Sequence, residues 1–240
     1  MNVKVILSSV LFAFALIIGC ASDDKTSTGP GNNNNNPGTI ATDSIVDAEG
    51  NYYKIVQIGT QWWMAENLQV TKYANGDPIA NLTIDSMWQW TTSGAYCDVE
   101  NNSANRTTYG YLYNGFAIAD PRGIAPAGWH IPSDSEWTVL SDYLGTNAGG
   151  KTKTTGLSLW KTPNLGATNE TGFSAVPAGV RPPAGVFTNK TEIAFYWSTT
   201  QALPYPLISN YLCGMGYAEQ DFRRQYAPFQ MGLSVRCVKD

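Results

Sequence analysis

Few residues in this chain could carry out chemistry. There is one histidine, His130, and there are four cysteines, Cys20, Cys97, Cys213 and Cys237. A serine hydrolase needs a histidine to accept the proton of its nucleophile, and His130 lies in a segment that we expect to be structural. A zinc site usually combines histidine and cysteine ligands at short spacing, which these residues do not offer. We therefore find no catalytic constellation and predict no metal site and no enzyme.

Aromatic residues give a second kind of chemistry. The chain has 8 Trp and 13 Tyr, and sugar rings stack on aromatic faces while amide and carboxylate groups take their hydroxyls. Carbohydrate binding is therefore the sharpest functional hypothesis. The alternative is that the aromatic side chains fill a core that lacks long helices, which is the interpretation we favour for Trp129, Trp137 and Trp197.

A polar loop before Phe173 supplies the best candidates for a ligand or cation site. It contains Asn164, Asn169 and Glu170, whose oxygens suit Ca²⁺. The Glu-Pro-Asn and Gln-Pro-Asp tripeptides of calcium-dependent lectins are absent. Calcium is thus an open alternative, and we otherwise predict no cofactor.

The element expected to organise the fold is a strand-to-helix junction at residues 128–137. It contains Trp129, His130 and Pro132 in an extended segment, followed by Ser133, Glu136 and Trp137. Ser133 and Glu136 have the spacing of a capping box, which predicts that a helix begins here. Trp137, Leu140 and Leu144 then fall on one helix face, which must be buried.

The rest of the region after residue 43 has the pattern of a β-rich domain. A hairpin is expected around the turn at 48–51, a turn at 72–79 and a loop at 120–123. Strands are expected at 195–200, 207–212 and 232–240, with Leu233, Val235 and Cys237 on one face of the last.

The beginning of the chain predicts export. An apolar run at residues 5–18 has the length of a signal-peptide core and ends at Gly19 and Cys20. The end of the run resembles a bacterial lipobox, which implies a signal peptide at 1–19 and a lipid on Cys20. Residues 20–42 are polar and Asn-rich, so we predict a disordered tether there. The acidic residues just after Cys20 resemble a signal for surface export, which implies a surface-exposed anchor in the outer membrane.

Composition excludes one large class of partner. The net charge is −4, and basic residues are not concentrated in a run. A nucleic-acid binder needs a concentrated cationic face to displace counterions. We therefore predict contact with a membrane through the lipid, and with a glycan or another surface protein, but not with nucleic acid.

Six ordered blocks between residues 43 and 240 carry a family resemblance. They are GTQWWMAENL at 59–68, YGYLYN at 109–114, GWHIPSDSEW at 128–137, GFSAVPAG at 172–179, FYWSTT at 195–200 and SVRCV at 234–238. Together they resemble the Fibrobacter succinogenes major paralogous domain, which is similar to the C-type-lectin-like fold of formylglycine-generating enzymes. The resemblance implies one compact α+β domain over residues 43–240, with a small twisted antiparallel sheet, about two helices and long irregular loops. It implies no activity.

The lectin-like resemblance also implies a disulfide. Cysteines of the terminal strand in such folds are often tied to an early element, so Cys97–Cys237 is the preferred pair and Cys213–Cys237 the alternative. We expect a lipid-anchored surface protein that acts as a binding or adhesion module. A protein-interaction or structural envelope module is the second hypothesis, and an enzyme of the formylglycine-generating type is the third.

Overall fold

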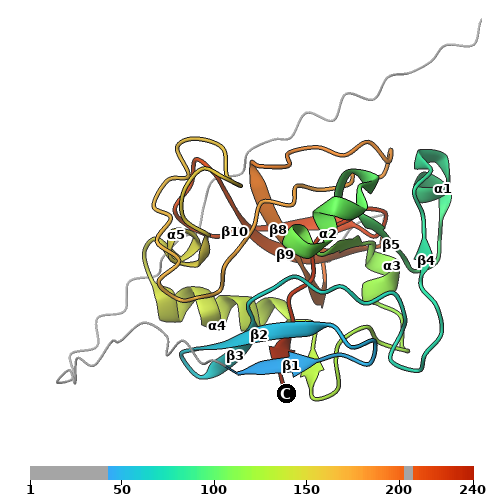
Figure 1. Cartoon of the computed structure of the whole chain (residues 1–240), viewed down its shortest axis with the longest axis horizontal. Coiled ribbons are helices and arrows are strands. Elements are labelled where there is room, and N and C mark those ends of the chain that lie inside the picture. Colours follow the sequence, from blue (N-terminus) through green and yellow to red (C-terminus); the bar gives the residue numbers. More distant parts are fainter. Residues whose placement is uncertain (1–42, 203–207) are drawn as a thin grey trace, which may run out of the picture. The chain divides into compact units, whose positions relative to one another are not determined.

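The computed structural model describes residues 43–202 and 208–240 (Figure 1). The predicted signal peptide, the lipidation site Cys20 and the tether at 20–42 lie outside these residues. Within the described ranges, no helix is both long enough and apolar enough to cross a bilayer.

The first sheet joins the beginning and the end of the domain. Its order is β1-β2-β3-β11-β7, and every neighbouring pair is antiparallel. The strands are β1 (Ser44–Val46), β2 (Tyr52–Ile58), β3 (Gln61–Met64), β11 (Val238–Lys239) and β7 (Trp129–His130). The predicted hairpin at 48–51 is present, because the Asp47 carboxylate accepts bonds from the backbone N–H groups of Glu49 and Asn51.

Two smaller sheets complete the β structure. One has the antiparallel order β10-β9-β8, and the other has the order β4-β5-β6, in which β4 and β5 are parallel. Their strands are β8 (Ile193–Gln201), β9 (Ser209–Gly216), β10 (Arg223–Pro228), β4 (Ala80–Asn81), β5 (Ala95–Asp98) and β6 (Tyr111–Tyr113). The expectation of one small antiparallel sheet is therefore wrong, because three short sheets share the core.

The helices are also more numerous than expected. Instead of about two, the described residues form five α-helices: α1 (Asp85–Trp90), α2 (Arg106–Tyr109), α3 (Gly115–Ile118), α4 (Asp134–Leu144) and α5 (Ala148–Thr152). Two 3₁₀ turns, η1 (Val99–Asn101) and η2 (Ser103–Asn105), precede α2. Only α4 exceeds two turns, so only α4 has a hydrophobic period long enough to detect in the sequence. The α+β class is correct.

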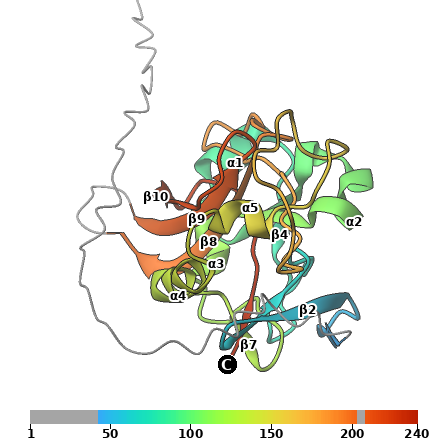
Figure 2. The same cartoon turned by 90° about the vertical axis from the view of Figure 1, so that its left-hand side faces the viewer.

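Helix α4 packs its apolar face against the aromatic core. Trp137, Leu140 and Leu144 are buried, as expected. The ring of Trp137 lies 4.7 Å from that of Trp63 and stacks at 5.6 Å on that of Tyr196, which places α4 against β3 and β8. Figure 2 shows α4 beside β8 and β9. The capped helix thus joins two of the three sheets.

Three fully buried cations fix the loops around this core. The Arg236 guanidinium donates to Asn67 Oδ1 and to the carbonyls of residues 64, 173 and 174. Lys153 Nζ donates to the carbonyls of residues 165, 216 and 219. Arg181 donates to the carbonyls of residues 82, 83 and 185 and to Asp85. Most of these carbonyls lie in loops and lack partners in a sheet, so the cations satisfy acceptors that would otherwise be buried alone.

The closing segment differs from the predicted strand. Leu233, Val235 and Cys237 are fully buried, but so are the intervening Ser234 and Arg236. Both sides of the segment are covered, so an inward–outward alternation does not exist, and the regular strand is limited to Val238–Lys239. Arg236 explains the deviation, since its side chain needs a buried pocket of carbonyls.

Candidate functional site

The junction predicted around His130 is a structural connection. The hydroxyl of Ser133 accepts from the N–H of Glu136, and the Glu136 carboxylate accepts from the N–H of Ser133, which completes the capping box. His130 lies between two carboxylates, with Nδ1 2.7 Å from Asp240 and Nε2 2.7 Å from Glu136. Partial burial opposes protonation of His130, but these two hydrogen bonds raise its pKa overall. Both ring nitrogens are therefore engaged in holding β7, α4 and residue 240 together.

The predicted disulfide is not formed. Cys97, Cys213 and Cys237 are free and buried, and each lies in a different hydrophobic cluster. Burial raises the pKa of all three thiols, that of Cys97 to about 12. The predicted Cys97–Cys237 pair and its Cys213–Cys237 alternative are both wrong, because each thiol packs in its own apolar cluster.

The predicted polar loop does not converge on one point. Asn164 donates to the carbonyls of residues 154 and 156, whereas Asn169 bonds to Ser174. Glu170 lies near Thr168 and 3.9 Å from Lys151. Asn164 and Asn169 have φ angles of 47° and 50°, so each occupies a left-handed turn that favours asparagine. Across the described ranges, no three His, Cys, Asp or Glu residues are grouped so that they could hold a metal ion.

Asn169 of this loop borders a hollow. A cavity of about 400 Å³ lies between β2, residues 65–67 and the loop at 169–176, with Arg236 among its lining residues. The Arg236 guanidinium makes four hydrogen bonds to the acceptors described above and lies 4.5 Å from the centroid of the Phe173 ring. The buried Arg236 network therefore forms part of the lining of this hollow.

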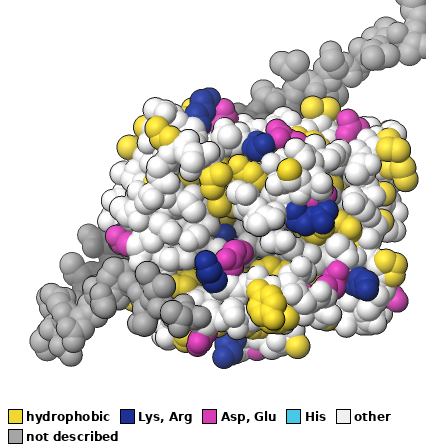
Figure 3. All heavy atoms as spheres, viewed as in Figure 1, with side chains coloured by type: hydrophobic (Ala, Val, Ile, Leu, Met, Phe, Trp, Pro, Cys, Tyr) yellow, Lys and Arg dark blue, Asp and Glu magenta, His cyan; other side chains and the backbone are white. Residues whose placement is uncertain are grey.

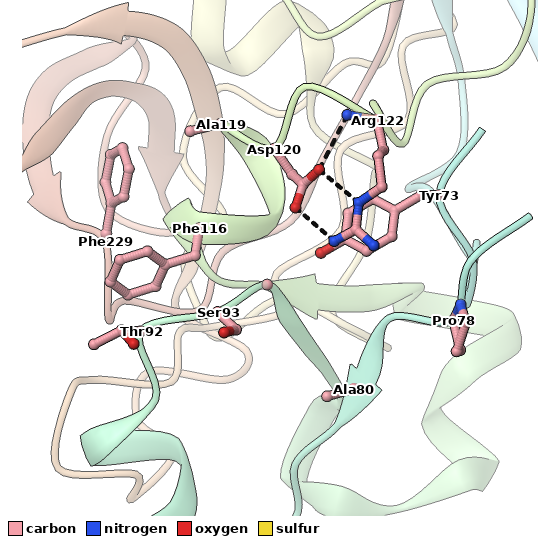
Figure 4. Close-up of a pocket in the computed structure, with 11 residues that line it drawn as sticks. Tyr73, Pro78, Ala80, Thr92, Ser93, Phe116, Ala119, Asp120, Arg122 and Phe229 are labelled. Atoms are coloured by element: carbon pink, nitrogen blue, oxygen red, sulfur yellow. Dashed lines mark hydrogen bonds and ion pairs between the residues drawn. The ribbon is translucent and has the colours of Figure 1, made fainter. Parts of the chain in front are cut away.

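A more open groove of about 430 Å³ lies beside β4 and α3 (Figure 4). Its lining residues are Tyr73, Pro78, Ala80, residues 92–94, Phe116 of α3, Ala119, Asp120, Arg122 and Phe229. The segments come from four separate stretches of the chain. Polar and aromatic side chains line the same hollow, so this groove is the best candidate for a binding site.

One wall of the groove is a fixed ion pair. Arg122 Nε and Nη2 lie 2.9 and 2.8 Å from the two carboxylate oxygens of Asp120, and Nη1 lies 2.9 Å from Asp77. The guanidinium also lies over the ring of Tyr73, 3.8 Å from its centroid. Hydrogen bonding to Arg122 lowers the pKa of Asp120 to about 2 and raises that of Arg122. Both groups therefore stay charged at any physiological pH.

The facing wall is aromatic. The rings of Phe116 and Phe229 meet edge to face, with centroids 5.3 Å apart. A Cβ at Gly115 would lie 2.6 Å from the Cα of Phe229, so glycine is required for this approach. Asn114 caps α3 by accepting from the N–H of Ala117 and also donates to the carbonyl of Ser93, which ties α3 to the groove segment.

The groove residues were not singled out in the sequence. The turn at 72–79 and the loop at 120–123 were predicted, but Tyr73, Asp120 and Arg122 come together only through the tertiary fold. The one local signal is the spacing of Asp120 and Arg122, which lets the carboxylate accept from the backbone and side chain of Arg122 within one turn.

The fold and the groove define an α+β domain of three small sheets with one open, aromatic and polar hollow. The chain belongs to the Fibrobacter succinogenes major domain family, whose model matches residues 56–239. This confirms the family predicted from the six sequence blocks. No curated protein and no solved structure matches the chain.

Proposed function

We propose that the chain is an exported, lipid-anchored binding module whose groove takes a neutral carbohydrate. The observation that carries this proposal is the arrangement of the two walls of the groove. Phe116, which packs against the buried ring of Phe229, supplies aromatic surface, while Asp120 and Arg122 supply hydrogen-bond acceptors and donors in fixed positions. Apolar ring faces and a ring of hydroxyls are the two features that a sugar presents to such a site.

The charges in the groove favour a neutral sugar. Asp77 and Asp120 share one cation, Arg122, so the ion-pair group has one net negative charge. A sulfated, phosphorylated or uronic-acid sugar would be repelled by this excess of carboxylate. The groove also favours binding over catalysis, because a carboxyl whose pKa is about 2 is a poor acid and a poor base at neutral pH.

The full-length chain, purified in detergent, can be tested on an array of neutral and acidic glycans. We expect binding to neutral glycans only. Phe116→Ala and Asp120→Asn should each weaken it at least tenfold, since the first removes the aromatic ring and the second removes the carboxylate that pairs with Arg122. Arg224→Gln is the control, because Arg224 forms a similar bidentate pair with Asp134, and neither residue lines the groove.

The assay should be repeated in EDTA. We expect no change, because the carboxylates of the groove are occupied by Arg122 and a calcium ion would have to displace it. Loss of binding in EDTA would instead support the calcium alternative. If the chain bound no glycan on the array, the carbohydrate proposal would be rejected and a protein-interaction or structural envelope module would be favoured.

The anchor and the finer fold class are parts of the same proposal. Lipidation of Cys20 would hold the module on the outer membrane, facing outward, and incorporation of labelled palmitate that is lost in Cys20→Ala would test this. We also propose that the domain is C-type-lectin-like. Support comes from its short, mainly antiparallel sheets, its single long helix and its long loops, and an experimental structure would test the assignment.

A further inference from the structure

Two Asn-Gly dipeptides occur in the chain, Asn75-Gly76 and Asn114-Gly115. The side-chain amide of an asparagine is open to attack by the backbone nitrogen of the next residue, and glycine has no side chain to obstruct the approach. The attack closes a cyclic imide and releases ammonia. Both dipeptides share this chemistry, and the fold gives them very different surroundings.

The second dipeptide is held inside the domain. The side chain of Asn114 is fully buried, and its Oδ1 accepts from the N–H groups of Ala95 and Ala117. The attacking group would be the N–H of Gly115, which donates to the carbonyl of Phe229 at 2.7 Å. Neither group can therefore move without opening the core.

The first dipeptide lies in a surface turn, in which residues 74–78 are all exposed. The φ angle of Gly76 is 91°, and a Cβ built there would meet no heavy atom within 4 Å beyond its chain neighbours. The N–H of Gly76 donates to the carbonyl of Tyr73 at 2.9 Å. Because the turn is exposed, this bond opens at a much smaller free-energy cost than a bond in the core.

The ion pair of the groove restrains this turn. Asn75 Nδ2 donates to Asp77 Oδ2 at 3.0 Å, and Asn75 Oδ1 accepts from the N–H of Asp77 at 3.0 Å. Arg122 Nη1 donates to the same Asp77 Oδ2 at 2.9 Å. Arg122 therefore fixes the carboxylate that holds the Asn75 side chain in place.

We propose that Asn75 is a site of spontaneous deamidation, and that Arg122 slows the reaction by holding Asp77. The Gly76 nitrogen loses its proton to solvent and bonds to Cγ of Asn75, the Cγ–Nδ2 bond breaks, and the leaving nitrogen takes a proton from solvent to depart as ammonia. Water then opens the imide at either carbonyl, which gives aspartate or isoaspartate at position 75. No oxidant or reductant takes part, and water is the one co-reactant.

The product would change the edge of the groove. On the face shown in Figure 3, basic and acidic side chains lie next to one another at several places. A carboxylate at position 75 would instead add a third negative group to Asp77 and Asp120, which share the single cation of Arg122. An effect on sugar binding rests on the proposed function, whereas the modification itself does not.

The test follows both dipeptides in the full-length chain in detergent at mildly alkaline pH, by peptide mass spectrometry and isoaspartate methylation. Each rate is divided by the rate at the same site in the chain unfolded in guanidinium chloride, which removes the effect of the neighbouring sequence. We expect this ratio to be at least about tenfold larger at Asn75 than at Asn114. A ratio at Asn75 no larger than that at Asn114 would overturn the modification site.

Arg122→Gln tests the restraint on the turn. It should speed the conversion of Asn75 by about two- to fivefold, because the ion pair that it removes is exposed and contributes little. Arg224→Gln is the matched control, since it removes an exposed pair with Asp134 and should leave the rate unchanged. Equal rates in the two variants would overturn the role of Arg122 and leave the modification site and the proposed function intact.

Discussion

We expect replacement of Arg236 to lower the free energy of unfolding strongly. Its side chain is fully buried and bonds to four acceptors: Asn67 Oδ1 at 2.6 Å, and the carbonyls of Met64, Phe173 and Ser174 at 3.0, 2.5 and 3.1 Å. Burial lowers the pKa of Arg236, which reflects the cost of removing the guanidinium from water. Arg236→Met keeps the apolar stem and removes every donor.

The loss can be estimated from the acceptors that remain. A buried acceptor without a partner costs about 1–3 kcal/mol, and at the lower end four of them give about 4 kcal/mol. Domains are stable by only about 5–15 kcal/mol, so this is a large fraction of the total. In a domain of this size it corresponds to a fall in Tm of about 8–16 °C. Arg236→Lys should lie between the two, because an ammonium has three donors and lacks the planar fork.

Urea unfolding followed by tryptophan fluorescence would measure this change. The matched control is Arg224→Met, since the side chain of Arg224 is half-exposed and its pair with Asp134 should contribute less than about 1 kcal/mol. If Arg236→Met lost no more free energy of unfolding than Arg224→Met, the assignment of Arg236 as a central support of the loops would be refuted.

Two further predictions concern the junction at α4. The raised pKa of His130 means that its stabilising contribution is complete below its unfolded pKa of about 6.5 and is lost as the pH rises through the higher folded value. His130→Gln should therefore lower Tm more at pH 5.5 than at pH 9, and equal shifts in thermal scans at the two pH values would contradict this. Trp137→Ala should lower the free energy of unfolding by about 3–5 kcal/mol, because it removes the ring that contacts Trp63 and Tyr196. Val139 is exposed, so Val139→Ala should lower it by less than about 1 kcal/mol. Similar urea midpoints for the two variants would exclude a buried role for this face of α4.

Short sequence patterns predicted the elements that are stabilised by interactions between residues close together in the chain. The capping box of Ser133 and Glu136 needs only four consecutive residues, and the buried face of α4 follows from a period of 3.6. The β1–β2 hairpin depends on the Asp47 turn in the same way. Strand β8 was found because its residues are β-branched and aromatic.

The rest depends on contacts between distant residues. Arg181, Lys153 and Arg236 would be placed on the surface by their charge, and nothing near them in sequence reveals the carbonyls that hold them inside. The groove has the same character, because Phe116 and Phe229 are separated by more than a hundred residues and meet only in the folded chain. Short helices such as α1 and α3 are too brief to show a period.

The position of β11 sets the order in which the domain can be completed. This strand follows every other element in the chain, yet it lies between β3 and β7 inside the first sheet. Almost all of residues 43–240 must therefore be synthesised before this sheet can close. Until then β3 and β7 lack the strand that joins them, because each pairs with β11 and they do not pair with one another.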